Sequence, residues 1–251
     1  MPQNGWSQMA RQGMDRFRSE TLSVDAVRQG SSSPRSQQIG DGAVQMHVLE
    51  LLTARLCHEL SAPIAAINNG VELLADDDPD PGSPPRTDFG HEAATLIGDS
   101  ARRAASRLQF YRFAYGFGRG SAIAGPAPHE LAAAMFNGSR IVCNYSEGVR
   151  RLPLEWQKLG CNLLSVGAET LPRGGRLVLS AEPLNLEAIN EVTDLHPDTG
   201  AALMLTTPTG QLTSRTIQAF LAGLLAKALG CRLLATAEPG HVRLTVLAGD
   251  A

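Results

Sequence analysis

The residues best suited to chemistry are one histidine and two charged neighbours on the same stretch of chain. Glu59 follows His58 directly, and Arg55 precedes it by about one helical turn. A neutral imidazole at about pH 7 has a lone pair that can attack phosphorus, and the resulting phosphoramidate is reactive enough to be passed on. Glu59 can orient the ring or accept its proton, and Arg55 can steady a phosphoryl group or an acidic partner surface. These residue types therefore indicate phosphoryl transfer, unless Glu59 and Arg55 are ordinary charges of a solvated helix surface.

The segment around His58 has the pattern of a helix that presents the imidazole away from its apolar side. At about 100° per residue, the large apolar residues fall on one face, a predicted buried seam of Leu49, Leu52, Leu56, Leu60, Pro63, Ile67 and Leu74, with Val71 near its edge. His58 lies about 200° from Leu56, so it faces solvent or a partner. The outer face around it is formed by Ser61, Ala62, Ala65, Asn68, Asn69 and Glu72. Because most of these side chains are small, we predict that another protein docks closely there.

Two long helices position this face. The first begins at residue 43 and ends at the acidic and proline-rich run 76–85, and the second covers 88–117. Joined by a short loop, they form an antiparallel hairpin over residues 43–120. Its apolar stripe has to meet another copy or another domain, and a dimeric four-helix bundle is the simplest solution. The second helix also carries polar residues that either continue the docking face or form a solvated surface: Arg102, Arg103, Arg107, Tyr111, Arg112 and Tyr115.

The remainder of the chain divides into a polar tail and a mixed domain. Residues 1–42 contain few apolar residues that could build a core, and we expect them to be mostly disordered. Residues 126–251 alternate helical and strand patterns, which predicts an α+β domain. Predicted helices cover 128–138, 153–171 and 212–230, and predicted strands cover 140–145, 176–183, 231–237 and 241–248.

Composition excludes several functional classes. The net charge of -3 provides no basic stripe for a phosphate backbone, so we expect no nucleic-acid partner. No run approaches the roughly 18–20 apolar residues of a membrane span, and the N-terminus has no apolar signal region. The four cysteines are scattered and the other histidines lack metal-ligand spacing, so we expect a cytoplasmic protein without a metal site.

A family resemblance rests on the runs RLCHEL (55–60), Pro63 and AINNG (66–70). Together they resemble the phosphoacceptor motif of dimerising histidine phosphotransfer domains, most of all the ChpT family of alphaproteobacterial histidine phosphotransferases. Residues 160–183 resemble the N-box region of a histidine-kinase ATPase domain, and 212–230 resemble the last helix of ChpT-type proteins. The resemblance covers roughly residues 45–250. It implies a helical hairpin that dimerises into a four-helix bundle, followed by a degenerate Bergerat-type, ATPase-like α/β sandwich.

The resemblance also implies an activity and partners. His58 would take a phosphoryl group from the receiver domain of a hybrid histidine kinase and pass it to response regulators, in a pathway such as cell-cycle control or motility. The docking residues would then hold a receiver domain, whose own Mg2+ would neutralise charge.

One departure from the kinase pattern concerns nucleotide binding. Asn162 matches the first N-box asparagine, but Val166 stands where the magnesium ligand should be, and neither a DxGxG segment nor a glycine-rich lid is found. We therefore expect no cofactor of the chain's own. Two alternatives stay open: a non-catalytic dimeric adaptor for response regulators, and an autophosphorylating histidine kinase.

Overall fold

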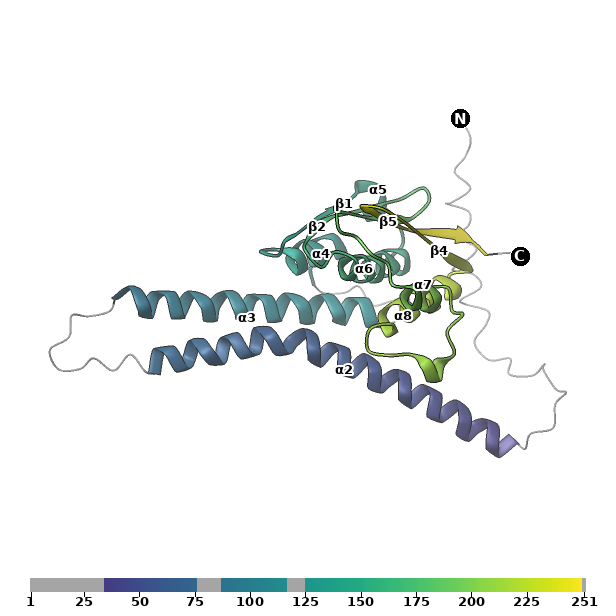
Figure 1. The fold of residues 1–251 in the computed structure, drawn as a ribbon, viewed down its shortest axis with the longest axis horizontal. Helices are drawn as coiled ribbons and strands as arrows, with labels where there is room; N and C mark the ends of the chain where they lie inside the picture. Colours follow the sequence, from purple (N-terminus) through teal and green to yellow (C-terminus); the bar gives the residue numbers. More distant parts are fainter. Residues whose placement is uncertain (1–33, 76–86, 117–124, 250–251) are drawn as a thin grey trace. The chain divides into compact units, whose positions relative to one another are not determined.

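The computed structural model describes residues 34–75, 87–116 and 125–249 (Figure 1). The chain divides into two compact units, each described here by itself. One unit is Ala54–Asn137, and the other is Gly138–Ala251 with the part of the chain that precedes Ala54. The predicted α+β class is confirmed, because a helical region is followed by a five-stranded sheet with its own helices.

The first unit is built on an antiparallel helical hairpin. It contains the part of α2 (Pro34–Ala75) from Ala54 onward, α3 (Thr87–Tyr115) and α4 (Pro128–Phe136), and α4 packs against α3 (Figure 1). Helix α2 begins at Pro34, inside the segment that was expected to be disordered, and residues 1–33 lie outside the described residues. Helix α4 lies in the same contact unit as the hairpin, and the predicted start of the following domain at residue 126 stays a prediction.

The two long helices approach closely at a glycine. Gly70 on α2 is buried, and a Cβ atom added to it would lie 2.6 Å from the Ile97 side chain of α3. The apolar seam that was predicted for α2 is only partly covered within one chain. Pro63 is buried, but Leu49 is 58% exposed and Leu74 is 42% exposed. One partner helix covers only part of the circumference of α2, which explains the difference.

The second unit contains a mixed sheet of order β1-β2-β3-β5-β4. Its strands are β1 (Ile141–Tyr145), β2 (Gly175–Ser180), β3 (Asn185–Ile189), β4 (Cys231–Glu238) and β5 (His241–Ala248). Strand β1 pairs with β2 in parallel, and all other neighbours are antiparallel. Alternate residues such as Leu177, Leu186 and Leu244 are fully buried on one face. Strand β3 is not among the strands predicted from the sequence.

Helices cover that face of the sheet. Helix α6 (Leu154–Glu169) packs against β2, β3 and β5, and α8 (Ile217–Ala228) packs against α6 and β4. Shorter helices are α5 (Glu147–Arg150), α7 (Pro197–Leu203) and the 3-10 turn η1 (Thr209–Gln211). Helix α8 begins later than predicted, because Thr216 Oγ1 accepts a 2.9 Å hydrogen bond from the Thr213 N–H in the turn before it. Among the described residues, none of the helices has the length and apolar character needed to cross a membrane.

Candidate functional site

His58 lies on an exposed face of α2. Its side chain is exposed, as are the five predicted docking residues, Ser61, Ala62, Ala65, Asn68 and Asn69. The predicted orientation of the imidazole, away from the helical core, is therefore confirmed. The Ser61 hydroxyl donates a 2.7 Å hydrogen bond to the Cys57 carbonyl, so this side chain lies back against its own helix. The result is a shallow surface with an accessible nitrogen nucleophile. The docking role of its neighbours stays a prediction.

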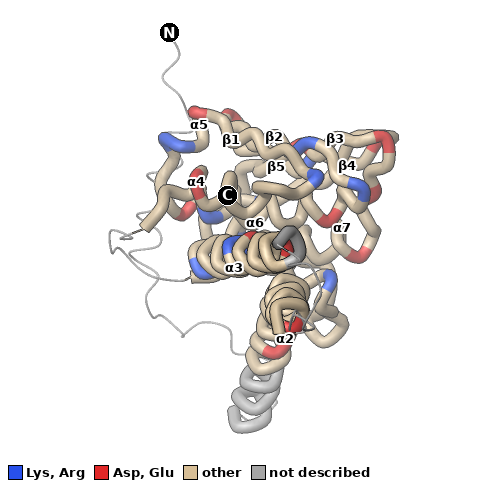
Figure 2. Tube along the Cα trace, turned by 90° about the vertical axis from the view of Figure 1, so that its left-hand side faces the viewer, with Lys and Arg blue, Asp and Glu red and all other residues tan. Residues whose placement is uncertain are grey.

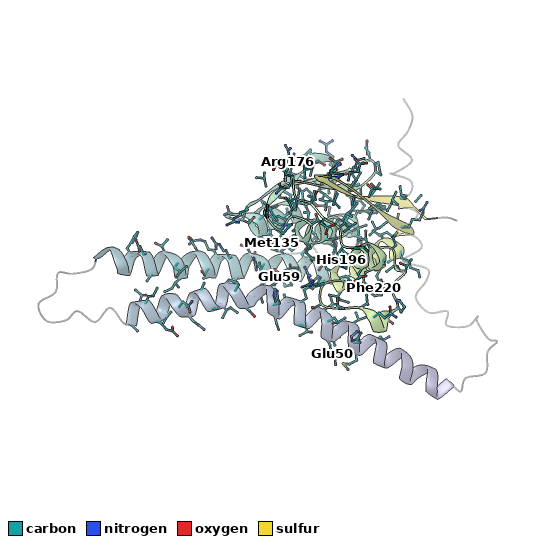
Figure 3. All side chains as sticks on the ribbon, viewed as in Figure 1. Glu50, Glu59, Met135, Arg176, His196 and Phe220 are labelled. Atoms are coloured by element: carbon teal, nitrogen blue, oxygen red, sulfur yellow. The ribbon has the colours of Figure 1, made fainter. Side chains whose placement is uncertain are left out.

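Glu59 lies on the side of α2 that faces α3 (Figure 3). Arg107 of α3 contacts it at two places. The Arg107 Nη1 donates a 2.6 Å hydrogen bond to the Glu59 backbone carbonyl and lies 3.3 Å from the Glu59 Oε2. Both side chains are partly buried: that of Arg107 is 34% exposed and that of Glu59 is 23% exposed. Glu59 is thus fixed to the second helix rather than extended into solvent.

Arg55 is also directed into the hairpin. It is 8% exposed, and its guanidinium donates a hydrogen bond to the Tyr115 hydroxyl of α3. Burial raises the pKa of Tyr115, and the positive charge of Arg55 opposes that rise. The Tyr115 ring also lies against Tyr111, with 5.1 Å between ring centroids. The proposed contact between Arg55 and a phosphoryl group stays a prediction, since the contacts of this side chain are within the hairpin.

We refer to Arg55, Glu59, Arg107 and Tyr115 as the inner cluster. Two of its members come from α2, on either side of His58 in the sequence, and two come from α3. From the sequence, Arg107 and Tyr115 are predicted only as docking or solvated residues, and their pairing with α2 is not predicted. The sequence signal for this pairing is Pro63, which lies four residues after Glu59 and has no N–H to donate to the Glu59 carbonyl. The arrangement places the nucleophile on the outside of α2 and a set of charged and aromatic contacts beneath it.

The N-box-like residues of the second unit are buried on α6. Asn162 and Val166 are both 0% exposed. Asn162 Oδ1 accepts a 2.8 Å hydrogen bond from Gln218 Nε2 of α8, and its amide nitrogen donates to the Lys158 carbonyl at 2.9 Å. The asparagine therefore joins two helices of the unit.

Similarity to known proteins involves both units. Residues 127–240 match the family described as histidine phosphotransferase C-terminal domain. Protein phosphotransferase ChpT of Brucella abortus (strain 2308) is 36% identical over 136 residues, which amount to 53% of this chain and 59% of that protein. A solved structure described as "1.7 Angstrom Structure of a Bacterial Phosphotransferase" matches with a TM-score of 0.61 and 25% identity. The match covers 88% of this chain and 100% of the chain in that structure.

Proposed function

Because this chain carries a histidine phosphotransferase C-terminal domain and is similar to protein phosphotransferase ChpT, we propose that it relays phosphoryl groups between receiver domains through His58. The observation that carries the proposal is the exposed imidazole of His58 on a helical face formed mostly by small, exposed side chains. Such a face lets a receiver domain bring its aspartyl phosphate within reach of the ring. A nucleophile buried in the hairpin would have no such access.

The chemistry needs one nitrogen and correct alignment. The lone pair of one His58 nitrogen forms a bond to phosphorus while the bond from phosphorus to the donor's aspartate oxygen breaks, and the carboxylate leaves with the electron pair. The second ring nitrogen keeps its proton. Transfer to the acceptor reverses these changes on a second aspartate. Receiver-bound Mg2+ supplies charge neutralisation, and this chain supplies the nucleophile and its orientation.

Two buried residues support a relay that needs no nucleotide. Asn162 uses its side-chain oxygen for Gln218 and its side-chain nitrogen for a helical carbonyl. Val166, at the position of the kinase metal ligand, is an apolar residue inside the same helix layer. We therefore propose phosphoryl transfer without ATP and without a cofactor of the chain's own.

Exposed apolar residues on the hairpin support a homodimer. Among the side chains that the structure describes on α2 and α3, eight large apolar ones are more than a third exposed, and they include Ile64 at 48%, Val71 at 52% and Leu108 at 49%. Ile64 and Val71 are seven residues apart, so they lie on one stripe of α2. A second copy would cover this stripe and complete a four-helix bundle with two His58 sites.

We propose partners and location as follows. The donor is the receiver domain of a hybrid histidine kinase and the acceptors are response regulators, in a cytoplasmic pathway such as cell-cycle control. Exposed basic residues on α3, among them Arg103 and Arg112, provide positive charge for an acidic receiver surface (Figure 2). A non-catalytic adaptor that binds the same receivers is the second candidate, because the same face would serve it.

A reconstituted transfer assay separates these functions. The protein is mixed with a phosphorylated receiver in the absence of ATP, and acid-labile label is followed on wild type, His58→Gln and, as a matched control, His91→Gln on an exposed site of α3. The relay predicts label on wild type and His91→Gln only, and its chase onto a second receiver. Receiver binding without label on wild type would identify an adaptor, and label from ATP alone would identify a kinase.

A further inference from the structure

A proline inside α2 leaves one backbone carbonyl without its helical donor. In an α-helix the N–H of each residue donates to the carbonyl four residues earlier, and proline has no N–H. Pro63 lies in the interior of α2, so the carbonyl of Glu59 lacks the usual N–H donor four residues later. A proline ring also crowds that carbonyl, which bends helices, and α2 is visibly bent along its length (Figure 1).

Arg107 supplies the missing donor from the other helix. Its Nη1 lies 2.6 Å from the Glu59 carbonyl oxygen and 3.3 Å from the Glu59 carboxylate. One guanidinium therefore holds both the backbone and the side chain of the same residue. Such charge-assisted bonds are stronger than those between neutral groups. The gap that Pro63 creates in the helical ladder is thus filled by a long-range contact.

The residue held in this way adjoins the nucleophile. Glu59 follows His58, so the position of the Glu59 backbone fixes the Cα of His58 and the direction in which its imidazole leaves the helix. Arg55 ties the other end of the same turn to Tyr115 of α3. The turn that carries His58 is therefore bound to α3 at both ends. In-line phosphoryl transfer depends strongly on such alignment.

We propose that Arg107 is a positioning residue for phosphoryl transfer, which replaces the backbone donor that Pro63 lacks and so fixes the turn that carries His58. This inference rests on the proposed function. Arg107 touches neither the phosphoryl group nor the receiver in this role. It acts on the rate of transfer within the bound complex and leaves receiver affinity unchanged.

Single-turnover transfer from a phosphorylated receiver, measured over a range of receiver concentrations, tests the proposal. Arg107→Met is expected to lower the maximal rate about ten- to a hundredfold with the half-saturating receiver concentration unchanged. The matched control is Gln109→Met, an exposed position on the same helix, which should keep the wild-type rate. Rates are expressed per folded molecule from circular dichroism. A higher half-saturating concentration, or a maximal rate equal to wild type, would overturn the proposal.

A second variant restores the donor by another route. Pro63→Ala supplies a backbone N–H to the Glu59 carbonyl. In the Pro63→Ala variant, Arg107→Met should therefore lower the maximal rate of transfer only a few-fold. If Arg107→Met lowers the maximal rate as much in the Pro63→Ala variant as in the wild-type chain, the contact with the Glu59 carbonyl is not the reason for the lower rate. If wild type itself accepts no phosphate, the proposed function fails. If wild type and Arg107→Met transfer equally, only the role of Arg107 fails.

Discussion

Replacing Gln218 with leucine should destabilise the second unit by leaving a buried oxygen without its hydrogen-bond donor. Gln218 and Asn162 are both 0% exposed, and their side chains are 2.8 Å apart. Because water does not replace the lost donor at a fully buried site, we expect the free energy of unfolding to fall by about 1–3 kcal/mol. The same substitution at exposed Gln211 should change it by less than about 0.5 kcal/mol.

The magnitude becomes diagnostic in a double-mutant cycle. Asn162→Leu removes the other partner, and the double leucine variant has no unpaired polar atom at this contact. The double variant should therefore lose less stability than the two single variants lose together, with a coupling energy of about 1 kcal/mol or more. Urea unfolding followed by fluorescence of Trp156, which is 3% exposed on α6, measures each variant in the unit concerned.

Additivity would refute this reasoning. If the double variant loses as much as the two single variants together, the buried pair does not act as a unit. The losses would then reflect changes in side-chain shape rather than an unpaired oxygen. A changed m-value in either single variant would equally count against a local effect.

Three further predictions concern packing, assembly and pH. Ile64→Asp combined with Val71→Asp should convert a dimer to a monomer in sedimentation velocity, because assembly would bury unpaired charges; a dimer that persists refutes the proposed interface. Gly70→Val should lower the free energy of unfolding by about 1–3 kcal/mol, since the added carbon meets Ile97 at 2.6 Å, and unchanged stability would contradict close helix packing. Burial raises the pKa of Cys143 from 9.0 to about 12. As the pH rises, the unfolded chain therefore loses this thiol proton before the folded chain does, and the free energy of unfolding should fall between those two pH values. Cys143→Ala should flatten that fall in pH-dependent urea unfolding, and an identical slope in wild type and variant would refute the assignment.

The outward orientation of His58 could be predicted because it depends only on the angle between successive residues of a helix. The same reasoning failed for Leu49, whose exposure depends on how much of α2 a partner covers. Strand β3 was missed because it turns only two apolar side chains, Leu186 and Ala188, toward the core. Its identity as a strand depends on β2 and β5 pairing on either side, and β5 lies far along the sequence.

The inner cluster could not be predicted either. The composition of α3 showed arginines and tyrosines but not which of them reach α2, because that depends on the register of two helices. Pro63 revealed that the Glu59 carbonyl would lack a helical donor, but no local rule identifies a donor that lies 48 residues away in Arg107. The contact of Arg55 with Tyr115 could not be predicted for the same reason, because it is set by the fold of the hairpin.

The order of the strands has a consequence for synthesis of the chain. Strand β5 lies between β3 and β4, so neither neighbour has a partner on that side until Ala248 has been made. During translation, β3 would expose one edge through the synthesis of more than fifty residues, and exposed edges pair readily with other chains. A ribosome that stalls before residue 241 would therefore release a sheet that lacks the strand between β3 and β4. Such fragments should aggregate or be degraded, whereas a chain complete through β5 can close the sheet.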